Sequence, residues 1–213
     1  MSDNLSNIPN QNTPSLVFTG EGYITATPDI AKIDIGVQTI GNNLSAIEEE
    51  NARSSASLLN SIRNLGVNNI VSKEYSINKV YDYDSGGTRI DRGYIIRNIL
   101  ELTVDNIGNI GTIIDAGVSS GANVVENISF QISNYSSYYQ DALNLAIMNA
   151  YDKAQSVYQL LGREERPVFL NIVEQANRPT TNTSDLKLRE GVYITPIEPG
   201  ETRINASVTV DFI

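Results

Sequence analysis

The chain of 213 residues contains no cysteine, no histidine and no tryptophan. Without cysteine there is no thiol nucleophile and no disulfide bond, and without histidine there is no Ser-His-Asp triad and no Cys/His zinc site. These absences exclude most classes of hydrolase, oxidoreductase and zinc enzyme. The residue types therefore predict a protein without enzymatic activity, with no catalytic residue, no metal and no cofactor, and they leave any ligand-binding residues unknown.

The sequence also lacks long apolar runs and basic clusters. No stretch approaches the roughly 18 apolar residues of a membrane span, so we expect no transmembrane span. The first residues have neither a basic nor an apolar region, so no signal peptide is visible. The 15 basic residues stand singly among 25 acidic ones, for a net charge of −10. Such a chain repels phosphate backbones, so we expect no nucleic-acid partner.

The length and composition indicate one ordinary folded domain. Hydrophobic residues make up 40% of the chain and charged residues 19%, a mixture that is too apolar for general disorder. Residues 1–15 are polar and carry little to bury, which predicts a flexible polar tail. Residues 16–213 are then predicted to form a single domain.

Hydrophobic periodicity predicts an α+β fold with antiparallel sheets. Strands are expected at 16–26, 33–38, 71–81, 94–104, 128–132, 167–174, 192–194 and 204–212, and helices at 44–65, 107–118 and 136–161. Residues 30–133 would then form a ferredoxin-like βαββαβ core, with an added long helix and a C-terminal β-hairpin. Residues 176–190 are polar and are expected to form a loop.

Local signals make these predictions more specific. Ser45 and Glu48 fit a capping box, which would put Glu48, Glu49 and Glu50 in the first turn of the first helix, and Gly66 would end it. Gly20 and Gly22 indicate either a bulge or a close approach of another backbone. Alanines recur every four residues in the longest helix and predict a buried ridge against a sheet or helix: Ala142, Ala146, Ala150 and Ala154.

Two residue spacings match motifs of catalysis or metal binding, but neither match meets the other requirements of its motif. Ser76 and Lys79 match Ser-x-x-Lys, but residues three apart in a strand point to opposite faces, and the second match, Ser184 and Lys187, falls in the polar loop. The segment from Asp82 to Gly87 is similar to a calcium loop, but it has glycine at the third ligand position and again at the twelfth. We interpret this segment as a solvated hairpin tip.

Three further motifs have simpler interpretations. Gly20-x-Gly22 lacks the third glycine of a dinucleotide fingerprint and precedes a strand rather than a helix. The glutamates at 48–50 could bind a cation, but a solvated helix start explains them. The aromatic cluster Tyr135, Tyr138 and Tyr139 could form a stacking platform, but the acidic charge favours a contact at a subunit or domain boundary.

The order of these signals resembles the SIMPL-domain family, long catalogued as a domain of unknown function, over about residues 16–213. The residues that carry the resemblance are Thr19-Gly20-Glu21-Gly22, Pro28-Asp29-x-Ala31, Gly36-Val37-x-Thr39, Asn51-Ala52, Tyr94-x-x-Arg97-Asn98, Gly111-x-Ile113-x-Asp115-Ala116-Gly117, Gly121-Ala122-Asn123, Ile128-x-Phe130, Ala142-x-x-x-Ala146, Ala150-x-x-Lys153-Ala154 and Pro196-Ile197-Glu198-Pro199-Gly200. The resemblance implies an α+β fold and a bacterial protein outside the cytoplasm, in the periplasm, on the cell surface or secreted. It also implies links to oxidative stress, assembly into ring- or channel-like homo-oligomers, and no established catalytic residues.

Three functional hypotheses remain open from the sequence. The first is a non-enzymatic cell-envelope or surface protein that acts by homo-oligomeric self-assembly, with itself as partner. A terminal strand often lies at a sheet edge, so the strand at 204–212 is the expected contact. The second is a stress-related small-molecule-binding protein, for which a cavity would be evidence. The third is a carboxylate-based hydrolase, which would need convergent carboxylates with shifted pKa values.

Overall fold

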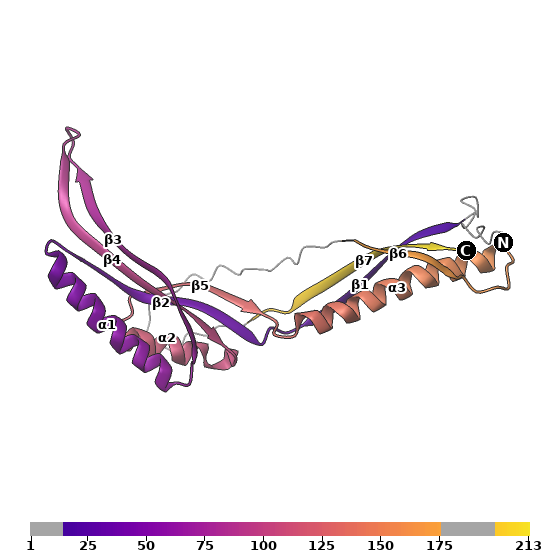
Figure 1. Cartoon of the computed structure of the whole chain (residues 1–213), viewed down its shortest axis with the longest axis horizontal. Helices are drawn as coiled ribbons and strands as arrows, with labels where there is room; N and C mark the ends of the chain where they lie inside the picture. Colours follow the sequence, from indigo (N-terminus) through magenta and orange to yellow (C-terminus); the bar gives the residue numbers. More distant parts are fainter. Residues whose placement is uncertain (1–14, 176–198) are drawn as a thin grey trace, which may run out of the picture. The chain divides into compact units, whose positions relative to one another are not determined.

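The computed structural model describes residues 15–175 and 199–213 (Figure 1). Its elements confirm the predicted α+β class. They are β1 (Leu16–Ala26), β2 (Ile30–Gly41), α1 (Leu44–Asn64), β3 (Asn69–Tyr83), β4 (Arg89–Val104), the 3₁₀ turn η1 (Ile107–Asn109), α2 (Ile110–Ser119), β5 (Val124–Gln131), α3 (Tyr135–Leu160), β6 (Phe169–Gln175) and β7 (Thr202–Phe212).

The described elements fall into two compact units. One contains β1, α3, β6 and β7, and the other contains β2, α1, β3, β4, α2 and β5. The sequence predicts a single domain over residues 16–213 and does not anticipate this division. The predicted tail at 1–15, apart from its last residue, and the predicted strand at 192–194 lie outside the described residues.

The second unit is a four-stranded antiparallel sheet in the order β3-β4-β2-β5. Its element order is the predicted βαββαβ one. Both helices cover one face, where their apolar side chains pack on the inward side chains of β2 and β4 (Figure 1). The core comprises Ala31, Ile33, Ile35, Val37, Leu58, Ile62, Val67, Leu100, Leu102, Val104, Ile110, Ile113, Ile114, Ala122 and Ile128. Among the described residues, no helix of this unit covers the opposite face of the sheet.

The start of α1 differs from the prediction. The N-cap is Asn43, whose backbone is extended and whose side-chain oxygen accepts a hydrogen bond from the Ala46 N–H at 3.2 Å. The capping box at Ser45 is therefore wrong, because Asn43 already satisfies the free N–H. The glutamates at 48–50 consequently lie beyond the first turn. The predicted helix end is confirmed, since Gly66 adopts φ +85°, a conformation that favours glycine.

The first unit is a three-stranded antiparallel sheet in the order β1-β7-β6, with α3 packed on one face (Figure 1). Here the expectation that the last strand forms a sheet edge is wrong. β7 pairs with β1 on one side and β6 on the other, so it is the central strand. Its alternating apolar residues point to α3, and they are buried: Ile204, Ala206, Val208, Val210 and Phe212.

The predicted alanine ridge is confirmed, because Ala142, Ala146, Ala150 and Ala154 are all fully buried. The glycines of β1 make room for this ridge. β1 and β7 pair without a register shift, so a bulge at Gly20 and Gly22 is wrong and a close approach is right. A Cβ at Gly20 would overlap the Ala146 carbonyl oxygen, and one at Gly22 would overlap that of Ala142. Small residues on both elements therefore bring helix and strand together.

Candidate functional site

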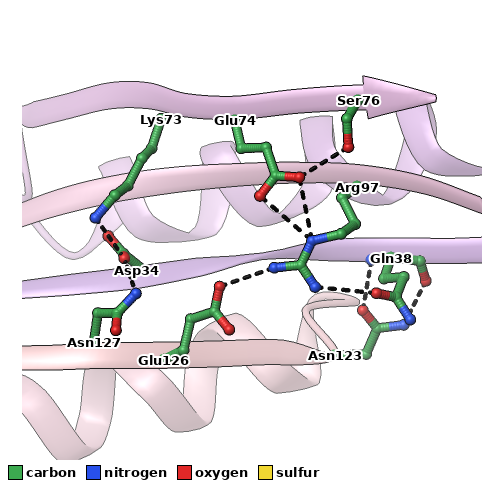
Figure 2. Close-up of polar contacts among 9 residues, drawn as sticks. All are labelled: Asp34, Gln38, Lys73, Glu74, Ser76, Arg97, Asn123, Glu126 and Asn127. Atoms are coloured by element: carbon green, nitrogen blue, oxygen red, sulfur yellow. Dashed lines mark hydrogen bonds and ion pairs between the residues drawn. The ribbon is translucent and has the colours of Figure 1, made fainter. Parts of the chain in front are cut away.

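The open face of the four-stranded sheet, opposite α1 and α2, carries a network of charged and amide side chains (Figure 2). Its residues come from all four strands and the turn before β5. They are Asp34, Gln38, Lys73, Glu74, Ser76, Arg97, Asn123, Glu126 and Asn127, with Lys32 and Glu101 beside them. Strand alternation explains this face, because Asp34 lies between two core isoleucines of β2 and so points away from the core.

Asp34 is the buried centre of one half of the open face, with only 2% of its side chain exposed. Its Oδ2 accepts hydrogen bonds from Lys73 Nζ and from Asn127 Nδ2, each at 2.7 Å (Figure 2). Both donors lie where the strand register shifts. Asn127 adopts φ +53°, which asparagine tolerates better than most residues. Bulges thus aim both donors at the carboxylate.

The hydrogen bond from Lys73 to Asp34 also sets the charge state of the lysine. It raises the pKa of Lys73 above its ordinary value, and the charge of Asp34 and contacts with Glu101 act in the same direction. Lys73 Nζ lies 3.6 Å from Glu101, which in turn lies 3.4 Å from Lys32. The lysine is therefore held as a cation between two carboxylates and is unsuited to act as a base.

Arg97 is the centre of the other half. Its guanidinium lies 3.3 Å from Glu74 and 2.8 Å from Glu126, and it donates to Gln38 Oε1 at 3.1 Å (Figure 2). These contacts link β4 to β3, β5 and β2. Cross-strand pairs of this kind stabilise a sheet in one register. The arrangement therefore clamps the four strands together.

Asn123 closes the network by continuing the β2–β5 ladder just before β5 begins at Val124. Its side-chain oxygen accepts from the Gln38 N–H, and its Nδ2 donates to the Gln38 carbonyl, both at 2.7 Å (Figure 2). One amide side chain thus satisfies the free edge of β2 as another strand would. This explains an asparagine in the motif Gly121-Ala122-Asn123.

A second polar cluster lies between α1 and the face of the four-stranded sheet that α1 covers. Asn51 is buried and donates to the Val37 carbonyl at 3.1 Å and to Thr39 Oγ1 at 3.3 Å. Thr39 donates to the Ile47 carbonyl, and Ser55 joins Asn51 to Asn98. Three separate motifs of the sequence therefore meet in one hydrogen-bonded cluster that joins α1 to the sheet.

The structure separates the residues of the rejected motifs. Ser76 donates to Glu74 on the open face, whereas Lys79 bonds Asp91 on the other face, so they form no catalytic pair. Ser184 and Lys187 lie outside the described residues. Asp84 accepts hydrogen bonds from the Gly86 and Thr88 N–H groups at the tip of the β3–β4 hairpin. In the chain as described, no three His, Cys, Asp or Glu side chains converge in a way that could hold a metal ion.

The edges of the three-stranded sheet are protected unequally. Side chains of α3 cover part of the outer edge of β1, since Asn149 accepts from the Glu21 N–H and Lys153 donates to the Thr19 carbonyl at 2.7 Å. No described strand lies beyond β6, and all its residues are exposed. We define the β6 edge surface by its large apolar side chains, which are Val168, Phe169, Leu170, Ile172 and Val173.

Tyr139 tethers β6 to α3. Its hydroxyl donates to Glu174, and its ring stacks on Tyr135 with centroids 6.1 Å apart. Two rings of the tyrosine cluster, those of Tyr135 and Tyr139, therefore contact each other within one unit. The bond to Glu174, with burial and the negative charge of Glu174, raises the pKa of Tyr139 to about 12.

The raised pKa of Tyr139 predicts a stability change at alkaline pH. A folded pKa above the ordinary value of 10.0 stabilises the fold below pH 10, and this contribution is lost as the pH rises through 10 toward about 12. Ultraviolet titration of tyrosinate should show a component near pH 12, which Tyr139→Phe removes. If the wild type and Tyr139→Phe gave the same alkaline titration curve, the assignment would be wrong.

One cleft lies at the end of the four-stranded sheet where α1 ends and α2 begins. Its volume is about 270 Å³, and both apolar and polar residues line it, among them Val67, Asn69, Asp105, Asn109 and Ile113. The volume is just below the roughly 300–1,000 Å³ of typical small-molecule sites. No described helix is long and apolar enough to cross a membrane.

These features define a class: an α+β protein of two units, each built on an antiparallel sheet, in which paired charged side chains link neighbouring strands. The model of the family SIMPL, "Protein of unknown function (DUF541)", matches residues 16–212, and the chain belongs to that family. The resemblance found in the sequence is thereby confirmed.

Curated relatives come from several bacteria. The chain is 24% identical over 213 residues to a "26 kDa periplasmic immunogenic protein" of Brucella melitensis biotype 1, covering 92% of this chain and 83% of the relative. It is 27% identical over 163 residues to "Uncharacterized protein YggE" of Escherichia coli K12, covering 73% of this chain and 64% of that relative. The first relative is thus described as periplasmic, and the second carries no functional description.

The polar sites were only partly accessible from the sequence. The motifs of the sequence contain Arg97, Asn98 and Asn123 but assign them no role. Asp34 belongs to none of these motifs and alternates with Ile33 and Ile35. A carboxylate inside an apolar alternation signals a residue on the opposite sheet face, yet its two partners are separated from it by 39 and 93 positions. Only the fold brings them together.

Proposed function

We propose that this protein is a non-enzymatic protein of the bacterial cell envelope or surface that acts by associating with copies of itself into a closed, ring- or channel-like assembly. The periplasmic description of the Brucella relative supports a location outside the cytoplasm. The pairing of the charged groups on the open face supports a non-enzymatic role, because carboxylates and cations that neutralise one another are poor acids, bases and nucleophiles.

The observation that carries the proposal is the β6 edge surface. An edge strand presents unpaired N–H and C=O groups that another strand can satisfy, and proteins usually blunt such edges with charges or coverage. In β6 the apolar residues outnumber the single carboxylate, Glu174, which already accepts from Tyr139. Pairing of β6 with a strand of another copy would bury these apolar side chains and would also satisfy the free N–H and C=O groups of the edge. A head-to-tail contact of this kind closes into a ring when the rotation between copies permits it.

Light scattering coupled to size-exclusion chromatography tests the proposal. The full chain should elute as an oligomer at physiological salt, and Leu170→Lys or Ile172→Lys should shift it to a monomer, because a charge is placed in the contact. The matched control is Val17→Lys in the same sheet, whose side chain is 57% exposed against 55% for Leu170. A wild-type monomer, or an equal effect of the control, would overturn the proposal.

Small-molecule binding is a second candidate function, favoured by the mixed lining of the 270 Å³ cleft. If the cleft holds a ligand, filling it should abolish binding. Ile113 is buried at its base, whereas Asn109 is exposed at its rim, so Asn109→Trp fills the cleft without disturbing the core. A ligand screen by thermal shift that finds compounds stabilising the wild type but not Asn109→Trp would support this function. Equal stabilisation of both would exclude the cleft.

A further inference from the structure

The β3–β4 hairpin extends beyond the sheet as a two-stranded ribbon (Figure 1). β2 ends at Gly41, which pairs with Tyr94 of β4. Past that point β3 runs on to Tyr83 and β4 begins at Arg89, and in the part of the chain that the structure describes these two segments pair only with each other. The ribbon therefore exposes both of its faces over its outer part.

One face of the ribbon is aromatic. Side chains two apart on a strand share a face, so Tyr75, Tyr81 and Tyr83 line up together. Tyr94 pairs with Lys79, and Arg89 pairs with Tyr83, so both join the same face. We define the tyrosine face by Tyr75, Lys79, Tyr81, Tyr83, Arg89 and Tyr94. Tyr75 is 60% exposed and Tyr83 is 66% exposed, and eight residue steps place them about 27 Å apart.

The cations of this face lie between the rings. Lys79 Nζ lies 5.7 Å from the Tyr81 ring centroid and 5.4 Å from that of Tyr94, and the Arg89 guanidinium lies 4.2 Å from the Tyr81 centroid. Lys79 is also bonded to Asp91 at 2.7 Å. Contacts of this kind limit ring motion, and tyrosine loses little side-chain entropy on binding. The rings of Tyr81 and Tyr94 are therefore held in place, and Tyr83 and Tyr75 extend the face in the two directions along β3.

We propose that the tyrosine face binds a linear, anionic polysaccharide. A pyranose ring presents a flat surface of C–H groups that can stack on an aromatic ring, and its hydroxyl groups can bond to phenol hydroxyls. The face runs from Tyr75, where β2 still flanks the hairpin, past Ile77 and onto the two-stranded ribbon. Such an extended row of rings fits a linear polymer, whereas a small ligand needs a concave pocket. Two cations against one carboxylate, Asp91, give the face a positive balance in a chain of net charge −10. This charge selects an anionic polymer.

A membrane surface fits the face less well. It would require the tip residues Asp82 and Asp84 to approach anionic headgroups, with repulsion between like charges. The proposal does not depend on self-association, because the tyrosine face and the β6 edge surface belong to different units.

Calorimetric titration with oligogalacturonate tests this inference, with its methyl ester as the uncharged probe and oligoglutamate as an anionic chain without sugar rings. The acidic sugar should bind most tightly, and its affinity should fall with added salt. Tyr75→Ala and Tyr83→Ala should each weaken it about tenfold. Lys79→Met should weaken binding of the acid form more than that of the ester.

Tyr23→Ala is the matched control. Tyr23 is 54% exposed on β1 and lies under a cation, with its ring centroid 3.6 Å from the Arg203 guanidinium, but it has no neighbouring row of rings. Its affinity for the acidic sugar should equal that of the wild type. The proposal would be overturned by an absence of binding, by an equal loss in Tyr23→Ala, by equal affinity for the methyl ester, or by equal affinity for oligoglutamate.

Discussion

Replacing Ala146 with leucine should lower the free energy of unfolding of the unit formed by β1, α3, β6 and β7 by about 1–3 kcal/mol. Ala146 is fully buried, and its helix backbone lies so close to β1 that even a Cβ at Gly20 would meet it. Three added carbon atoms have no space there, so helix and strand must separate. Gly22→Ala should act in the same way, because its Cβ would overlap the Ala142 carbonyl oxygen.

The measurement is urea unfolding followed by circular dichroism, with hydrogen exchange to locate the loss. Protection should fall in α3 and β1 and stay unchanged in α1 and β2, which belong to the other unit. Ser156→Leu is the control, since Ser156 is exposed on the same helix. Its stability should stay within about 0.5 kcal/mol of the wild type. An unaltered unfolding midpoint for Ala146→Leu would refute the close packing described here.

Replacing Asn51 with leucine should destabilise the other unit by about 2 kcal/mol. Asn51 is buried and donates to the Val37 carbonyl at 3.1 Å and to Thr39 Oγ1 at 3.3 Å, and its side-chain oxygen accepts from Ser55. Leucine has a similar size but no donor and no acceptor, so all three hydrogen bonds are lost. Each such bond contributes about 1 kcal/mol, and its loss in a buried cluster costs more.

Asn60→Leu provides the comparison for this substitution, because Asn60 is exposed on the same helix. It should leave the urea midpoint nearly unchanged. Ser55→Ala, which removes only the outer link between Asn51 and Asn98, should fall between the two. If Asn51→Leu were as stable as the wild type, the buried amide would contribute nothing to holding α1 on the sheet, and its proposed structural role would be wrong.

Most elements could be predicted because their signals are local. The alternation of Ile33, Ile35 and Val37 predicts a strand, and Gly66 after an apolar stripe predicts a helix end; both are present. The cap of α1 was misassigned because Asn43 and Ser45 are both good capping residues, and their choice depends on where the chain leaves β2. The edge position of the last strand is predicted from its place at the end of the chain, which does not determine the neighbours of a strand. The single domain is predicted from length and composition, which do not show how contacts divide between units.

The candidate site was less predictable than the fold. The sequence shows that reactive groups are few, but it does not show that Arg97 and Asp34 have their charges matched by distant partners. The tyrosine face was invisible for the same reason. Its rings come from two strands joined by a loop, and only the register that pairs Lys79 with Tyr94 puts them in one row.

The sequence by itself determined which side chains are present, with no thiol, no imidazole and an acidic balance. It also determined the spacing of apolar residues, which recur every two positions in the strands and, as alanines, every four positions in the longest helix. These depend on residue types and on neighbours within a few positions, so no fold is needed to read them. The tertiary structure decided which strands became central and which edge stayed open. It also decided which distant charges neutralise one another, because strand pairing and the close approach of β1 to α3 are contacts between segments far apart in the chain.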